Sequence, residues 1–164
     1  MNDSEFWSFI SKSREGVSEC EEQADKLSWL LSAQPAAEIL SFDELFAKKR
    51  KEAYRWNLWG AAYLINGGCS DDGFEYFRCW LISQGREVFE NALKNPDSLA
   101  DVLPEDFEEA ECEDILYAAD KAHEDLIGES LPARTFDGPS EPEGEEWEED
   151  ELDRLFPRLA ERFG

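Results

Sequence analysis

Apolar residues recur along this chain with the spacing of α-helices. From about Ser18 to Ala33 they return every three or four positions, which places them on one face of a helix: Cys20, Ala24, Leu27 and Leu31. The first residues show the same spacing after Asp3 or Ser4, either of which suits a helix N-cap. Pro35 suits the start of a third helix, whose apolar face runs from Ile39 to Phe46. No segment shows the clean alternation of a half-buried strand.

The most apolar part of the chain is the segment Tyr54–Leu93. Its first part, 54–65, is apolar almost all round, which is typical of a helix that is buried on most sides. Asn66-Gly67-Gly68 is predicted to end this helix, because glycine tolerates the left-handed conformation of a C-cap. Ser70 is expected to cap the next helix, with Asp71 and Asp72 in its first turn. The apolar stripe of that helix consists of Phe74, Phe77, Trp80 and Leu81.

The remaining pattern predicts two more helices and an acidic end. A short helix is expected from Arg86 to Leu93, and a last core helix from about Glu111 to Ile127, closed by Gly128. We therefore expect an all-α fold, with five or six helices around a single core in residues 1–128. An acidic C-terminal extension follows, with a flexible acidic linker at 129–150 and a short terminal helix at 149–164.

Net charge changes this picture more than the rest of the composition does. The chain carries a net charge of −24, and residues 95–164 hold 24 acidic and 5 basic side chains against 16 and 11 in residues 1–94. A field of that sign repels phosphate backbones, so we expect no direct binding of nucleic acid. It favours a protein partner, and a basic one in particular.

Other features exclude classes of protein. The chain has no apolar run long enough to span a membrane, and its acidic start is unlike a secretory signal. Its four cysteines are far apart, and none forms a C-x-x-C pair: Cys20, Cys69, Cys79 and Cys112. We expect reduced, mostly buried thiols in a cytoplasmic protein, with no metal site and no cofactor.

The basic string and the single histidine are expected to have structural roles. The string Lys48–Lys51 matches a nuclear-import signal, but consecutive residues point around a helix, so a solvated face is expected. The lone histidine, His123, lies on the last core helix without a catalytic motif beside it. We expect it to be a surface or packing residue.

The loop after residue 65 offers the best candidate chemistry. Gly67–Ser70 precedes a helix start and could present amides to an anion, although Asp71 and Asp72 oppose this. Asp71, Asp72 and Glu75 could bind a hard cation, or simply form an ordinary acidic first turn. Arg78 is expected either to pair with Glu75 one turn away or to bind an anion in a cleft.

The stretch from Tyr54 to Arg86 also carries a family resemblance, supported by Phe6-Trp7, Cys112-Glu113 and Tyr117-Ala118-Ala119. It resembles the signature of the bacterial domain of unknown function 4240 family, over roughly residues 3–128. The resemblance implies a small helical protein and carries no established activity. It directs attention to a set of candidate ligand- or partner-binding residues: Trp59, Asn66, Gly67, Gly68, Asp71, Asp72, Tyr76, Arg78, Trp80, Gln84 and Arg86.

Two hypotheses of function follow. The first is a non-enzymatic protein-binding module of the immunity-protein, antitoxin or adaptor type, which uses its acidic surface or a cleft at the 66–72 loop. The second is an enzyme or a sensor of small ligands or metals. Its pocket would be built from Asp71, Asp72, Tyr76, Arg78 and Arg86. We name no catalytic residue, and the sequence leaves the oligomeric state open.

Overall fold

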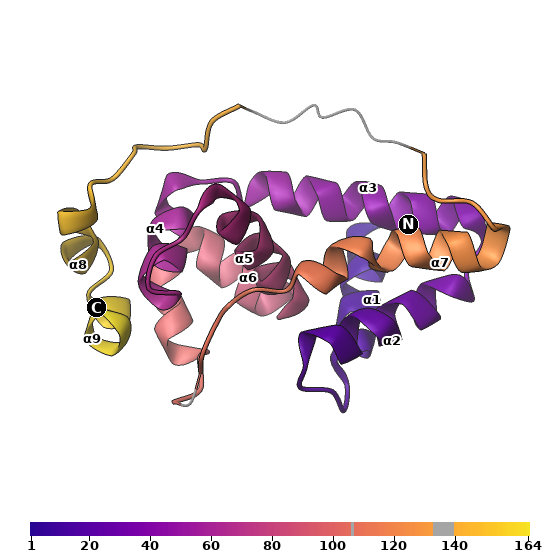
Figure 1. The fold of residues 1–164 in the computed structure, drawn as a ribbon, viewed down its shortest axis with the longest axis horizontal. Helices are drawn as coiled ribbons and strands as arrows, with labels where there is room; N and C mark the ends of the chain where they lie inside the picture. Colours follow the sequence, from indigo (N-terminus) through magenta and orange to yellow (C-terminus); the bar gives the residue numbers. More distant parts are fainter. Residues whose placement is uncertain (106, 133–139) are drawn as a thin grey trace.

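The computed structural model describes residues 1–105, 107–132 and 140–164, and the described residues are mostly helical (Figure 1). Seven α-helices make up the larger part: α1 (Asp3–Arg14), α2 (Cys20–Ser32), α3 (Ala36–Glu52), α4 (Trp56–Ile65), α5 (Asp71–Ser83), α6 (Arg86–Lys94) and α7 (Ala118–Ile127). Two 3-10 helices, η1 (Pro96–Asp101) and η2 (Glu113–Tyr117), lie between α6 and α7. The predicted all-α class is confirmed, since no named strand occurs in the described ranges.

The helices end where local chemistry favours an end. Ser70 caps α5, its side chain accepting a hydrogen bond from the backbone N–H of Gly73, and Gly128 closes α7 with a positive φ of 87°. The first helix is capped by Asn2, and neither Asp3 nor Ser4 takes that position. The predicted last core helix is divided into the 3-10 helix η2 and α7.

The core lies between α1, α3, α4 and α5, with α2 and α7 packed at one end. α2 contacts α1, η2 and α7, while α5 contacts α3, α4 and η2. The largest fully buried side chains are aromatic, and they come from helices far apart in the sequence: Phe6, Phe42, Phe74, Phe77 and Phe89. The aromatic density of the sequence therefore mainly fills this core.

The environment of the basic string Lys48–Lys51 contradicts the prediction that it forms a solvated face. Lys49 is only 6% exposed, and its Nζ lies 3.0 Å from Asp3 Oδ2 and 5.7 Å from the centre of the Trp7 ring. Arg50 donates to Glu75 Oε1 at 3.0 Å. The expectation of a solvated face is wrong for these two residues, because α3 packs against both α1 and α5, and Lys49 faces the first while Arg50 faces the second.

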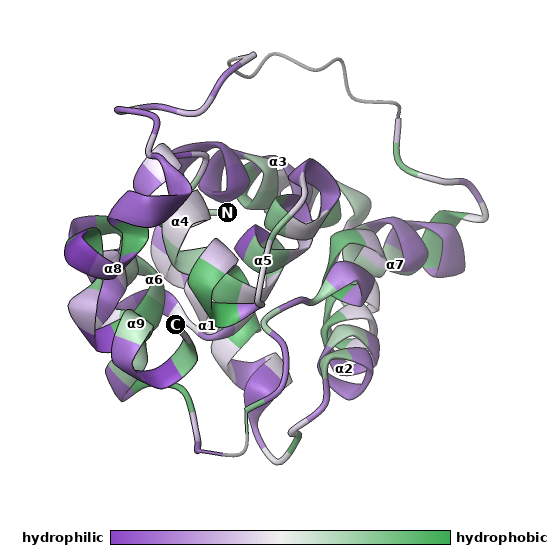
Figure 2. Ribbon diagram, turned by 60° about the vertical axis from the view of Figure 1, so that its left-hand side comes forward, coloured by the Kyte–Doolittle hydropathy of each residue, from purple (hydrophilic) through white to green (hydrophobic). Residues whose placement is uncertain are grey.

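The last described residues return to α4. Residues 149–163 form η3 (Glu149–Glu151), α8 (Leu152–Leu155) and α9 (Pro157–Phe163), with proline at the first position of α9. α8 and α9 contact α4, and α9 also contacts η1. In Figure 1 they lie at the end of the molecule opposite α7, and Figure 2 shows both hydrophobic and hydrophilic residues on each. Part of the predicted flexible linker, 133–139, lies outside the described residues.

Gly60 makes this contact possible. A Cβ atom there would lie 2.9 Å from side-chain carbons of both Leu152 and Phe156, and 3.0 Å from Trp147 Nε1. Glycine inside a helix costs about 1 kcal/mol relative to alanine, so its place in the middle of α4 needs a reason. The close approach of the C-terminal residues supplies that reason.

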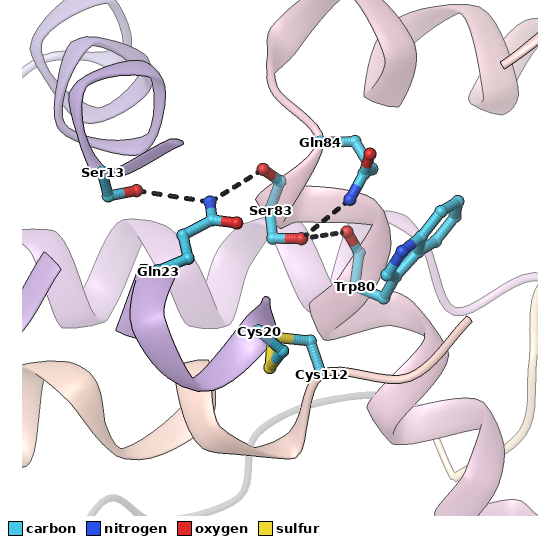
Figure 3. Close-up of a disulfide and its surroundings, with 7 residues drawn as sticks. All are labelled: Ser13, Cys20, Gln23, Trp80, Ser83, Gln84 and Cys112. Atoms are coloured by element: carbon cyan, nitrogen blue, oxygen red, sulfur yellow. Dashed lines mark hydrogen bonds between the residues drawn. A yellow bond between two sulfur atoms is a disulfide. The ribbon is translucent and has the colours of Figure 1, made fainter. Parts of the chain in front are cut away.

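A disulfide overturns the prediction that the cysteines are reduced thiols. Cys20, the first residue of α2, is bonded to Cys112, just before η2 (Figure 3). Their separation of 92 residues gives no sequence signal, because the packing of α2 against η2 and α7 alone brings them together. Cys69 and Cys79 are free.

A buried polar network lies beside the disulfide. The Gln23 side chain donates to Ser83 O at 2.9 Å and to Ser13 Oγ at 3.3 Å, which links α2 to α5 and to α1 (Figure 3). A buried amide is stable only when its hydrogen bonds are satisfied. This network therefore fixes the orientation of α2, on which the pairing of Cys20 depends.

We predict that the disulfide is a large part of the stability of the fold. Closing a loop of this length constrains the unfolded chain, so Cys20→Ser/Cys112→Ser should lose about 4 to 5 kcal/mol in urea unfolding. The control is Cys69→Ser, which should keep the wild-type sensitivity to reductant. If the double variant and the oxidised wild type unfold at the same urea concentration, the pairing is wrong.

Candidate functional site

The loop 66–72 is fixed by hydrogen bonds to a distant segment. Asn66 ends α4, and its side chain forms two bonds with the backbone of Ala110, accepting from N–H at 2.8 Å and donating to C=O at 3.3 Å. Next along, the N–H of Cys112 donates to Tyr76 O at 3.0 Å. Residues 110–112 are thus attached to both α4 and α5. Asn66 holds this segment in place through its own side chain.

Trp59 shapes the same loop from inside. Its indole Nε1 donates to Cys69 O at 3.0 Å, and its ring stacks on Phe74 with centroids 4.9 Å apart. The Trp59 ring also stacks with that of Trp56, with centroids 5.2 Å apart. A half-buried indole is stable where its N–H finds an acceptor, and here that acceptor belongs to the loop.

The start of α5 is already supplied with negative groups. Asp71 and Asp72 are exposed in the first turn, Ser70 caps the helix, and the Glu111 carboxylate lies so close that a Cβ on Gly73 would be 3.3 Å from its Oε1. Carboxylates are favourable at a helix N-terminus because they compensate the positive end of its dipole. The chain itself therefore fills the place that an anion would need.

The arginines predicted to line a cleft are engaged elsewhere. The Arg78 guanidinium lies 4.6 Å from the centre of the Tyr54 ring and 4.9 Å from that of Phe74, and it donates to Arg50 O at 3.1 Å. Burial lowers the pKa of Arg78. The expected pair of Glu75 with Arg78 is replaced by the Glu75–Arg50 pair. Arg78 thus fixes α5 against the end of α3.

The other candidate residues are spread over several surroundings. Trp80 is 8% exposed and packs against Phe77 and Phe107. Gln84 ends α5, and its backbone carbonyl accepts from Arg14 at 2.6 Å. Arg86 is exposed at the start of α6 and pairs with Glu90 at 3.0 Å, one helical turn away. These side chains do not converge with Asp71 and Asp72.

Tyr76 and Tyr117 lie among carboxylates near the same loop. Glu113 accepts a hydrogen bond from the Tyr117 hydroxyl at 3.2 Å, and its negative charge is the main reason why the pKa of Tyr76 is raised. Burial and the neighbouring Glu109 raise the pKa of Glu111. The segment that follows residue 108 therefore presents a negative surface beside α5.

The hollow at this loop is an open cleft of about 560 Å³ whose acidic wall comes from the C-terminal residues. One side consists of Tyr63, Gly67 and Gly68. The other carries Glu149, Asp150 and Asp153, and Leu152 and Phe163 also line it; among the described residues, none that lines it is basic. A hydrogen bond to Glu149 raises the pKa of the Tyr63 hydroxyl. We call this hollow the acidic cleft.

A family comparison separates the two sides of the acidic cleft. A family model described as a protein of unknown function, DUF4240, matches residues 1–125. The chain belongs to the DUF4240 family. No curated protein and no solved structure matches it. The DUF4240 domain thus supplies the glycines and Tyr63, while the carboxylates of the acidic cleft come from residues beyond the match.

Sequence reasoning identified the loop and missed the opposite wall. Glu149, Asp150 and Asp153 look like ordinary members of an acidic run, and nothing in their spacing places them near Gly67. The one available signal was Gly60, because a glycine in the middle of an apolar helix indicates a close approach by another segment. His123, predicted to be a surface or packing residue, is 8% exposed, with Nδ1 2.6 Å from Glu129 O.

The structure bears on two other possibilities, a membrane-spanning helix and a reactive thiol. Among the described residues, no helix is long and apolar enough to cross a membrane. Burial, with a contribution from Glu111, raises the pKa of the Cys69 thiol from 9.0 to about 12. A thiol reacts as its thiolate, so this cysteine is poorly suited to act as a nucleophile.

We predict that Cys69 resists alkylation in the folded protein. At pH 8 its thiolate fraction should be about a thousandfold below that of an ordinary thiol, from the difference between the two pKa values. Its rate of reaction with iodoacetamide, followed by mass spectrometry, should rise about tenfold per pH unit up to pH 11. Unfolding in urea should restore ordinary reactivity. Equal rates in the folded and unfolded chain would contradict this prediction.

Proposed function

We propose that this DUF4240 protein is a non-enzymatic protein-binding module that receives a basic segment of its partner in the acidic cleft. An immunity protein, an antitoxin or an adaptor would work in this way. The observation that carries the proposal is the wall of three carboxylates, Glu149, Asp150 and Asp153, with no basic side chain among the described residues of the lining. Lysine and arginine side chains complement such a wall, and carboxylates bind arginine with directional hydrogen bonds.

The net charge supports the same proposal at longer range. At −24 the chain attracts basic partners and speeds their encounter, most strongly at low salt. The negative surface around Tyr76 and Tyr117 extends the favourable field beyond the acidic cleft. The same field disfavours nucleic acid as a direct ligand.

The alternative, an enzyme or a small-ligand sensor, receives less support from the geometry. Its five residues would have to face one pocket. Arg78 is instead stacked on aromatic rings, Arg86 pairs with Glu90, and Asp71 and Asp72 lie in an exposed first turn. Cytoplasmic location also stays a proposal, and the Cys20–Cys112 disulfide removes the cysteine argument for it.

We predict that a basic peptide binds at the acidic cleft. The probe is a fluorescent decapeptide of alternating lysine, arginine and alanine, followed by anisotropy at low salt. Glu149→Gln/Asp150→Asn/Asp153→Asn should weaken its binding about tenfold, because three favourable charge contacts are lost. Added salt should weaken binding to the wild type as well.

The matched control removes the same charge elsewhere. Glu15→Gln, Glu22→Gln and Glu124→Gln change exposed residues at the C-cap of α1, on α2 and on α7, so their combined effect should stay within about twofold. If both triple variants weaken binding equally, the peptide responds to net charge alone. In that case the acidic cleft is not the site.

A further inference from the structure

The C-terminal segment, defined here as residues 140–164, contacts the DUF4240 domain as a ligand contacts its site. Glu143 joins the backbone of the domain first: its N–H donates to Tyr54 O and its carbonyl accepts from Trp56 N–H, both at 2.9 Å. Trp147 follows, its indole donating to Trp56 O at 2.6 Å. The backbone at the start of α4 thus fixes the register of the whole segment.

Apolar side chains of the C-terminal segment occupy the face of α4. Leu152, Phe156 and Leu159 are at most 4% exposed, and the first two lie against the bare backbone of Gly60. The Trp147 ring lies 5.5 Å from that of Tyr63 and 6.3 Å from that of Trp56. Their spacing, in short helices, is that of an amphipathic peptide in a groove.

Polar contacts with η1 and the residues after it fix the orientation of the C-terminal segment on the domain. The buried Asp97 carboxylate accepts from the backbone N–H groups of Arg158, at 3.2 Å, and Leu159, at 2.9 Å, which caps α9 from another part of the chain. The Arg162 guanidinium donates to the carbonyls of Ala100, Leu103 and Pro104 at 2.7 to 2.8 Å. Arg158 also pairs with Asp101. A helix N-terminus and a guanidinium both find acceptors on the domain.

Long-range charge opposes these contacts. Residues 129–164 hold 12 acidic and 4 basic side chains, and residues 1–128 hold 28 and 12, so both parts are strongly negative. The family match also ends at residue 125, before the C-terminal segment begins. Net repulsion lowers the stability of this contact, and the segment lies outside the family domain, so both observations favour a segment that another peptide can displace.

We propose that the face of α4 and η1 is a peptide-binding site of the DUF4240 domain, with residues 140–164 of the same chain as its built-in, displaceable ligand. A partner that replaces this ligand would carry a tryptophan, then leucine, phenylalanine and leucine at the spacing of Trp147, Leu152, Phe156 and Leu159, and an arginine that reaches the carbonyls beside η1. This inference does not depend on the acidic cleft receiving a basic partner.

The experiment first weakens the binding of the tethered segment to the face of α4 and η1, and then adds the same segment as a free peptide. Full-length Leu152→Ala/Phe156→Ala/Leu159→Ala leaves the domain face intact and removes the apolar anchors of its own ligand. A labelled synthetic peptide of residues 140–164 should bind this variant. It should bind the wild type at least about tenfold more weakly, because the tethered segment competes at high effective concentration.

A blocked variant and a salt series complete the test. Adding Gly60→Leu to the triple variant should abolish peptide binding, since a side chain there meets the anchors. Binding should strengthen with added salt, the opposite of the basic peptide at the acidic cleft, so the two proposals fail separately. Failure of the peptide to bind the folded triple variant, or equal binding to the blocked one, would overturn the proposal.

Two further outcomes are decisive. If the triple variant does not fold, Phe156→Ala takes its place, and limited trypsin digestion of the wild type is followed at Arg154, Arg158 and Arg162. The proposal requires cleavage there to be faster than in the domain and accelerated by excess peptide, because the peptide displaces the tethered segment from α4. If the digestion shows one cooperative unit, or if the wild type is a dimer that exchanges its segments, the tethered ligand is excluded.

Discussion

The contact of Leu152 and Phe156 with the bare backbone of Gly60 is the constraint on which the site depends. Without it α8 and α9 have no close surface on α4, and the carboxylates of Glu149, Asp150 and Asp153 have no fixed place beside Gly67. The missing side chain at Gly60, together with the backbone bonds of Glu143, therefore helps to determine where the most acidic part of the chain lies. The acidic cleft is a consequence of this apolar contact.

The DUF4240 domain prepares its half of the arrangement independently. Asn66 attaches residues 110–112 to the end of α4, and the indole of Trp59 fixes the loop from inside. The disulfide between Cys20 and Cys112 holds the same segment to α2. The Asn66 hydrogen bonds and the disulfide thus converge on residues 110–112, while Trp59 fixes the loop at Cys69. Together they keep the loop and its negative surface in place against the repulsion of like charges.

Local chemistry made much of the fold predictable. Helical spacing, Ser70 as a cap and Gly128 as a C-terminal stop are encoded in neighbouring residues, so the sequence indicates them directly. The burial of Lys49 and the disulfide could not be predicted, because each depends on two helices that meet only in the folded chain. The candidate loop was found by its glycines and charges. Its opposite wall, from an acidic run 80 residues away, has no local signal.

Backbone hydrogen exchange in the wild type and in Gly60→Ala tests whether the close approach at Gly60 holds the C-terminal segment in place. We expect protection in residues 140–164 of the wild type, notably at Glu143 and Leu159, whose N–H groups donate to Tyr54 and Asp97. In Gly60→Ala this protection should fall at least about tenfold while that of α1 to α7 persists. Unchanged protection in the variant, or none in the wild type, would contradict it.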